Sequence, residues 1–133
     1  MLVRTPAIIL RRYDYSESSQ VAHVYSRQEG RVSVLGKGSK KASATMKGPI
    51  DALQVANIAY RTRRGSPLRL LTRYEPLHPF DGLRARLDRL YAAFYLAELL
   101  ADGAREHDPD PELFDAMLSA WVALDGAPRR AVP

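Results

Sequence analysis

The sequence of 133 residues contains no cysteine, which excludes disulfide bonds and metal sites built on thiolates. Its three histidines, His23, His78 and His107, lack the spacing of a metal site. No apolar run approaches the roughly 20 residues of a membrane-spanning helix, and the run from Ala7 to Leu10 is too short for a signal peptide. We therefore expect a cytoplasmic protein that binds no metal and contacts no membrane.

Motifs of catalysis are also missing. The serine-rich stretches lack the context of a nucleophile elbow, and residues 36–41 lack the spacing of a phosphate-binding P-loop. Asp108, Asp110 and Glu112 could attract a cation, but the start of a helix accounts for them equally well. We expect a protein that is not an enzyme and needs no cofactor.

Positive charge is concentrated in the first part of the chain. Residues 1–79 contain 14 Lys or Arg and 5 Asp or Glu, whereas residues 80–133 contain 6 Lys or Arg and 10 Asp or Glu. The pI near 9.7 favours anionic partners, with nucleic acid ahead of anionic lipid. This distribution predicts a surface for polyanions in the first part, with a packing or partner-binding platform beside it.

The first part has the pattern of a small β-barrel. Alternating or β-branched apolar residues predict strands over residues 3–15, 21–26, 31–35, 53–61 and 68–75. Residues 36–49 are rich in Gly, Ser and Lys, and they predict a long basic loop between the third and fourth strands. Five strands with one long connection fit the five-stranded oligonucleotide/oligosaccharide-binding (OB) barrel better than an open sandwich.

Two or more helices are expected after the barrel. Asp81 is the expected N-cap of a helix that ends near Gly103, and Asp110 is the expected N-cap of a second helix that stops at Gly126. In a chain cut short, the face that carries Trp121 would lose its cover and be exposed. The residues expected to form the apolar core stripe are Leu83, Leu87, Leu90, Phe94, Leu113, Phe114, Met117 and Trp121.

A series of short segments occurs in a distinctive order along the chain. They are Ile9-Leu10-Arg11, Tyr15-x-Glu17-Ser18, Arg27-x-Glu29-Gly30-Arg31-Val32, Gly36-Lys37-Gly38-Ser39-Lys40-Lys41, Thr72-Arg73-Tyr74-Glu75-Pro76-Leu77, Pro79-Phe80, the helix over residues 83–100, and Pro109-x-Pro111-Glu112-Leu113-Phe114. Each segment alone is common, but the ordered series resembles the N-terminal part of the RecO family of bacterial recombination mediators.

The resemblance implies an OB-fold, nucleic-acid-binding domain over residues 1–79 and the truncated start of a helical domain over residues 80–133. It implies a DNA repair protein that binds single- and double-stranded DNA, anneals complementary strands and helps load recombinase onto DNA coated by single-strand-binding protein (SSB). The implied partners are DNA, RecR and the C-terminal tail of SSB, in the bacterial cytoplasm at the nucleoid. Some relatives bind zinc through cysteines that this chain lacks. We expect the acidic part to begin a helical domain rather than to act as a counter-charge.

Basic side chains in the first part are the candidates for contacts with DNA phosphates. Lysines on the long loop can follow a backbone without reading its sequence, and arginines flank the turn at Gly65, one of the loops with which OB barrels grip a strand. The candidate DNA-binding residues are Arg11, Arg12, Lys37, Lys40, Lys41, Lys47, Arg61, Arg63, Arg64 and Arg73. The candidates for stacking on bases are Tyr15, Tyr60 and Tyr74.

Other interpretations remain open. The chain could be an interaction module that docks RecR or SSB and binds little DNA itself, or an RNA-binding barrel. Each basic group could also be an ordinary solvated loop or a hairpin protected by charge from edge pairing. Arg84, Arg86 and Arg89 could surround a groove for the SSB tail, although simple solvation explains them better.

Overall fold

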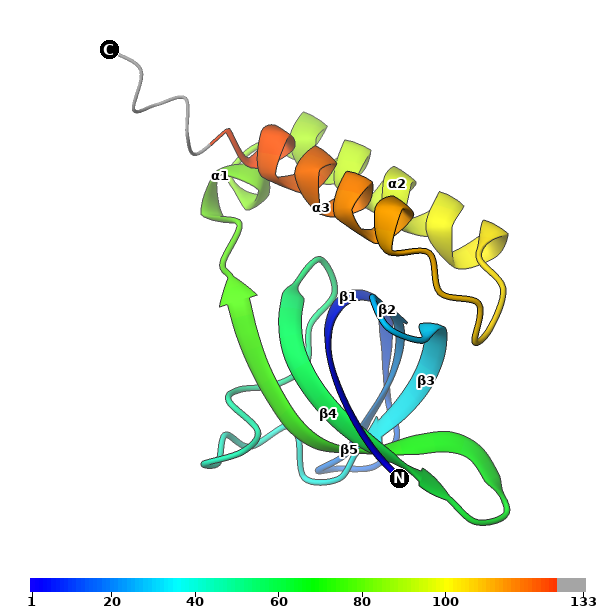
Figure 1. Ribbon diagram of the computed structural model, residues 1–133. Coiled ribbons are helices and arrows are strands. Elements are labelled where there is room, and N and C mark those ends of the chain that lie inside the picture. The colour runs from blue at the N-terminus through cyan, green and yellow to red at the C-terminus, as the bar shows by residue number, and fades with distance from the viewer. Residues whose placement is uncertain (127–133) are drawn as a thin grey trace.

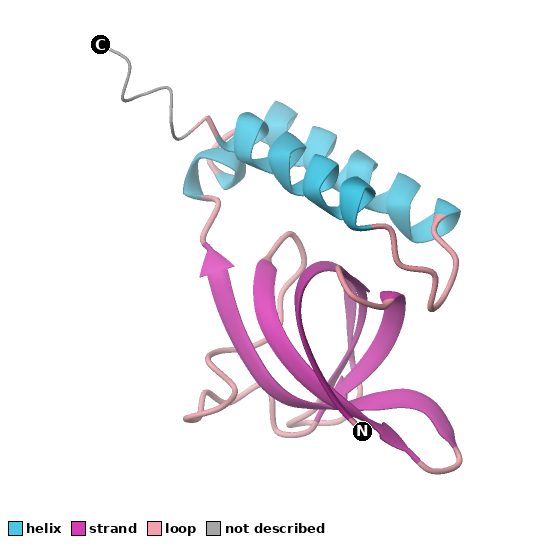
Figure 2. Cartoon of the chain, viewed as in Figure 1, coloured by secondary structure: helices cyan, strands magenta, loops and turns pink. Residues whose placement is uncertain are grey.

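The computed structural model describes residues 1–126 and shows a closed barrel with a layer of helices on one side (Figures 1 and 2). The strands are β1 (Leu2–Asp14), β2 (Gln20–Ser26), β3 (Gly30–Gly36), β4 (Val55–Arg63) and β5 (Ser66–His78). The helices are α1 (Asp81–Arg84), α2 (Leu87–Gly103) and α3 (Pro111–Asp125). In this part of the chain, no helix has the length and apolar character that crossing a lipid bilayer requires.

The strand order around the barrel is β1-β2-β3-β5-β4, and β1 closes the barrel against β4. All neighbours are antiparallel except β3 and β5, which run parallel over the short pairing of Val34 with Arg69 and Leu35 with Leu70. Beyond that pairing, Met46 of the long loop forms a bridge with Tyr74 of β5. The five strands and the order of their connections are those of an OB fold, so the predicted fold class is confirmed.

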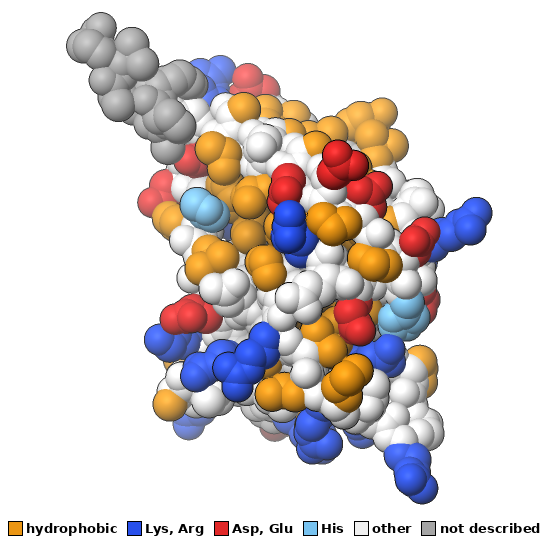
Figure 3. Space-filling view, viewed as in Figure 1, with side chains coloured by type: hydrophobic (Ala, Val, Ile, Leu, Met, Phe, Trp, Pro, Cys, Tyr) orange, Lys and Arg blue, Asp and Glu red, His pale blue; other side chains and the backbone are white. Residues whose placement is uncertain are grey.

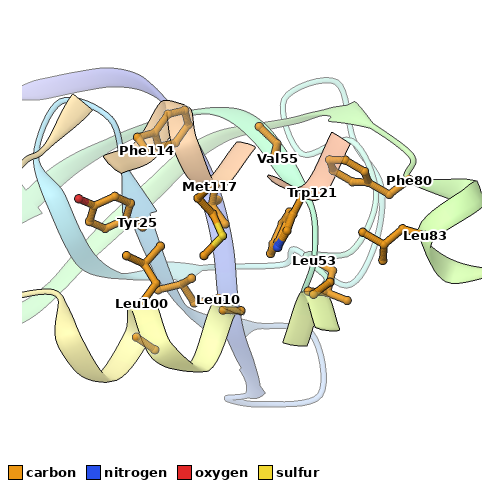
Figure 4. Close-up of a cluster of buried hydrophobic side chains, with 14 residues drawn as sticks. Leu10, Tyr25, Leu53, Val55, Phe80, Leu83, Leu100, Phe114, Met117 and Trp121 are labelled. Carbon is orange, nitrogen blue, oxygen red and sulfur yellow. The ribbon is translucent and has the colours of Figure 1, made fainter. Parts of the chain in front are cut away.

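Two apolar clusters stabilise this arrangement, one inside the barrel and one between the barrel and the helices. Along β1, Ala7 and Ile9 point into the barrel, whereas Ile8 and Leu10 point outward against the helical layer. Both faces of β1 are therefore buried over residues 7–10, which explains why this stretch is continuously apolar instead of alternating. Figure 4 shows the outer cluster, in which Leu10 lies near side chains from α2 and α3.

The expected single helix from Asp81 to Gly103 is broken into α1 and α2. Phe80 occupies the N-cap position with φ of 51°, so the prediction of an Asp81 cap is wrong. The chain is extended at Arg86 before α2 begins, and this break changes which face of the helix meets the barrel. Leu87 and Phe94, predicted in the core, are 63% and 41% exposed. The buried residues of α2 are Ala93, Ala97, Leu100 and Ala101.

Helix α3 begins and ends as predicted. The side chain of Asp110 accepts a hydrogen bond from the backbone N–H of Leu113, and Gly126 ends the helix with φ of 68°. Leu113 itself is partly exposed instead of lying in the core stripe. Trp121 is fully buried and lies edge-on to Phe80, with ring centroids 5.7 Å apart. The expectation of an exposed Trp121 is wrong because Phe80 and the barrel cover its face (Figure 4).

Candidate nucleic-acid interface

Arginines of the barrel hold the helical layer in place. The guanidinium of Arg11 donates to both carboxylate oxygens of Glu98, at 2.9 and 2.7 Å, and to Asp102 at 3.2 Å. Arg27 makes a paired contact with Asp115 at 3.0 and 3.1 Å. The predicted DNA contact Arg11 is therefore engaged with α2, which gives it a structural role.

The acidic residues of the helical part thus act as counter-charges to the barrel, contrary to expectation. Hydrogen bonds from the arginines hold the pKa values of Glu98 and Asp115 below their ordinary range. Arg31 joins the same interface, because it donates to the carbonyl oxygen of Ala101 at 2.8 Å and lies 4.0 Å from Glu106.

Three other predicted DNA contacts have acidic partners within the barrel. The ion pairs are Arg12 with Asp51, Lys40 with Asp14 and Lys47 with Glu75, each at 3.3 Å. All three basic side chains keep some exposure to solvent. Their charges are partly offset, so we rank them below unpaired residues as contacts for phosphate.

A second group of predicted residues meets where two loops pack together. The amide of Lys40 donates to the carbonyl of Ser18 at 3.1 Å, and its ammonium donates to the carbonyl of Ser16 at 2.8 Å. These bonds place the turn after β3 beside the loop between β1 and β2, where Tyr15 is 62% exposed. We call this the loop surface and define it as Tyr15, Lys37, Lys40 and Lys41.

A third group lies on the outer face of β1, β4 and β5. Arg4 pairs with Ala59 across β1 and β4, and Ala59 pairs with Arg73 across β4 and β5, so the three residues form one row. Arg61, two residues farther along β4, and the hairpin beyond it extend this basic face. We call it the arginine wall and define it as Arg4, Arg61, Arg63, Arg64 and Arg73.

Sequence reasoning missed Arg4, because only the strand register shows that it faces the same way as Arg73. Within the described residues, no ion pair is formed by Lys37, Lys41 or any side chain of the arginine wall. Figure 3 shows most of the Lys and Arg side chains of this view over the end of the barrel that lies away from the helices.

Of the three tyrosines predicted to stack on bases, two are buried and one is exposed. Tyr60 and Tyr74 are fully buried in the barrel core, so the prediction that they stack on bases is wrong. Burial raises the pKa of both hydroxyls, and Tyr60 also donates to Glu29 at 2.7 Å. Tyr15 remains available, and the exposed Tyr13, which lies edge-on to His23, is a further aromatic outside the core.

The helical layer covers part of the face that OB barrels commonly use. That face is formed by the second and third strands. Here Tyr25 of β2 stacks with Phe114 of α3 at 6.4 Å between centroids, and Arg31 of β3 is bonded to α2. The basic surfaces left open are therefore the loop surface and the arginine wall.

The arginine ring around an apolar groove, which the sequence offered as the weaker alternative to simple solvation, does not form. Arg84 donates to the carbonyls of Ala52 and Leu53, and Arg89 donates to the carbonyl of Asp125. An apolar hollow of about 400 Å³ does lie between α2 and α3, but no arginine lines it. Among residues 1–126, no three His, Asp or Glu side chains are grouped so that they could hold a metal ion.

Comparisons with known proteins agree with this fold. Residues 1–80 match the family model described as Recombination protein O N terminal, and residues 84–133 match Recombination protein O C terminal. The DNA repair protein RecO of Rhodopirellula baltica is 38% identical over 120 residues, which is 90% of this chain and 44% of that protein. RecO of Anaeromyxobacter dehalogenans strain 2CP-C is 33% identical over 128 residues, or 96% of this chain and 50% of that protein. The chain spans about half the length of the curated relatives that it matches.

Proposed function

The chain belongs to the RecO family, and we propose that it is a DNA-binding module of recombinational repair. In this proposal it holds single- and double-stranded DNA on the loop surface and the arginine wall. The observation that carries the proposal is that seven basic side chains of these two surfaces have no acidic partner among the described residues. They are Arg4, Lys37, Lys41, Arg61, Arg63, Arg64 and Arg73.

Unpaired cations on one end of a barrel favour binding to phosphates without a choice of sequence. Each neutralised phosphate releases condensed counterions, so affinity falls steeply as salt rises. Two strands bound near each other would repel each other less and meet at a higher local concentration, which favours annealing. No covalent bond changes in this scheme, so we propose a protein that is not an enzyme and needs no cofactor.

Whole RecO proteins provide the setting for the remaining steps. We propose that the complete protein helps load recombinase onto SSB-coated DNA, with RecR and the C-terminal tail of SSB as partners. An acidic tail and DNA would then compete for the same unpaired cations. A salt-dependent loss of DNA on addition of an acidic peptide would support this competition.

A second candidate function is the docking of a protein partner, as in an interaction module. The outer face of α2 favours it, because Leu87, Tyr91, Tyr95 and Leu99 recur every four residues and are 63%, 64%, 64% and 53% exposed. Retention of a partner protein without retention of DNA on the same sample would favour this function over DNA binding.

Salt titrations of fluorescence anisotropy test the main proposal. Lys37→Ala should weaken binding of a labelled single strand equally for unrelated sequences and reduce the salt slope by about 0.7 for one lost phosphate contact. Arg105→Ala is the matched control, since it removes one exposed positive charge outside both surfaces. The proposal fails if the wild-type chain does not retain DNA at low salt, or if both variants change affinity equally.

A further inference from the structure

We propose that the arginine wall is a second binding site for a nucleic-acid strand, separate from the loop surface, and that Arg4 and Arg73 bracket a phosphate at its centre. This inference rests on the proposed function, because it takes DNA as the ligand. It goes further by assigning two strands to two faces of one barrel.

The positions of the two central arginines follow from the strand register. Arg4, Ala59 and Arg73 are direct partners on three adjacent strands, so all three side chains point to the same outer face. Adjacent strands lie about 4.8 Å apart, which places the two arginine backbones about 10 Å apart with only a methyl group between them. A hollow of about 360 Å³ lies here and is lined in part by Arg4, Pro6, Ala59 and Arg73.

The bracket keeps its positive charge. Glu75 is the one acidic residue that lines the hollow, and it lies one row away, opposite Asn57. Its carboxylate accepts a hydrogen bond from the ammonium of Lys47 at 3.3 Å. Because Lys47 already offsets this carboxylate, the two arginines face the hollow with little opposing charge.

The two basic surfaces differ in chemistry as well as in place. The basic residues of the loop surface are all lysines, whereas those of the wall are all arginines. A guanidinium presents a planar fork that can donate two hydrogen bonds to one phosphate, whereas an ammonium acts as a point charge. We infer that the wall fixes the position of a strand and that the loop surface holds a strand more loosely.

The separation of the surfaces allows both to be occupied. Arg4 lies near the start of β1 and Tyr15 directly follows its end, eleven residues later. β1 bends between these two positions, because residues 2–8 pair with β4 and residues 7–14 pair with β2. The wall is formed by β1, β4 and β5, whereas the loop surface follows the ends of β1 and β3. A strand on one surface therefore leaves the other accessible.

Two short non-complementary oligonucleotides, one with a donor dye and one with an acceptor, test the inference. The wild-type chain should bring both strands together and give energy transfer, with two strands per chain by native mass. Arg4→Gln/Arg73→Gln and Lys37→Ala/Lys41→Ala should each keep one strand and lose most of the energy transfer. Arg86→Gln/Arg105→Gln is a matched control that removes two exposed charges elsewhere and should behave as wild type.

A second variant adds charge at the centre of the bracket. Ala59→Glu places a carboxylate between the two arginines and should reproduce the loss seen with Arg4→Gln/Arg73→Gln, whereas Ala59→Ser should not. Thermal unfolding of each variant confirms that the barrel is intact. The second binding site would be overturned if wild type bound only one strand, or if Arg4→Gln/Arg73→Gln left energy transfer undiminished. Either result would leave the proposed function standing. A wild-type chain that binds no DNA would overturn both.

Discussion

Replacing Arg11 with methionine separates a structural role from a role in DNA binding. The side chain makes two hydrogen bonds to Glu98 and one to Asp102, and the Arg11 and Glu98 side chains are 35% and 52% exposed. Exposed ion pairs contribute about 0.2–1 kcal/mol, and the paired geometry with Glu98 places this one near the upper end. We therefore expect Arg11→Met to lower the free energy of unfolding by about 1 kcal/mol.

Thermal unfolding measures this loss. With an unfolding entropy of about 2.1 cal/mol/K per residue, 1 kcal/mol corresponds to a fall in Tm of about 3–4 °C for a chain of 133 residues. A double-mutant cycle with Glu98→Gln should show that most of the effect belongs to the pair. The difference in Tm between wild type and Arg11→Met should shrink in high salt, because salt screens exposed ion pairs. Affinity for DNA should change less than twofold.

Acid provides a further check on the same pair. The hydrogen bond from Arg11 holds the pKa of Glu98 below its ordinary value of 4.5. A carboxylate with a lowered pKa in the folded state stabilises the fold fully above its unfolded pKa, and it loses this contribution as pH falls through the folded value. The Tm difference between wild type and Arg11→Met should therefore disappear in strong acid. An unchanged Tm together with a loss of DNA affinity as large as that of Lys37→Ala would refute the structural role.

Four further substitutions test the assignments of other residues. Tyr15→Ala should weaken single-strand binding about fivefold or more if the ring stacks on one base, whereas Tyr60→Phe should leave DNA affinity unchanged and lower stability by about 1 kcal/mol through its lost hydrogen bond. Trp121→Ala should cost about 3–5 kcal/mol in denaturant unfolding, and a variant of normal stability would contradict its place in the shared cluster. Gly30→Ala should destabilise the chain by more than 1 kcal/mol, because φ is +74° and the added Cβ would lie 2.6 Å from the backbone of Asp108.

The barrel was predictable from the sequence because its signals are local. Alternating apolar residues mark the strands, and the turn glycines Gly30 and Gly65 adopt the positive φ that tight turns require. The break in the first helix was not predictable in this way, because tertiary contacts impose it. The amide of Leu83 donates to the side chain of Asp125 at 2.8 Å, and Gly82 lies directly against the backbone of the same residue. Contacts with the end of α3 thus turn the chain before α2 begins and shift its apolar stripe.

The candidate site was only partly predictable, because the sequence counts charges and the fold decides which of them stay unpaired. Six of the fourteen basic residues of the first part form ion pairs, and Arg11, Arg27 and Arg31 do so with acids beyond residue 80. The same helices cover Tyr25 on the face of β2. The helical layer therefore selects the binding surface, since it occupies part of the usual face of an OB barrel and leaves the arginine wall open. Arg4 belongs to that wall through strand register alone, which no local pattern in the sequence contains.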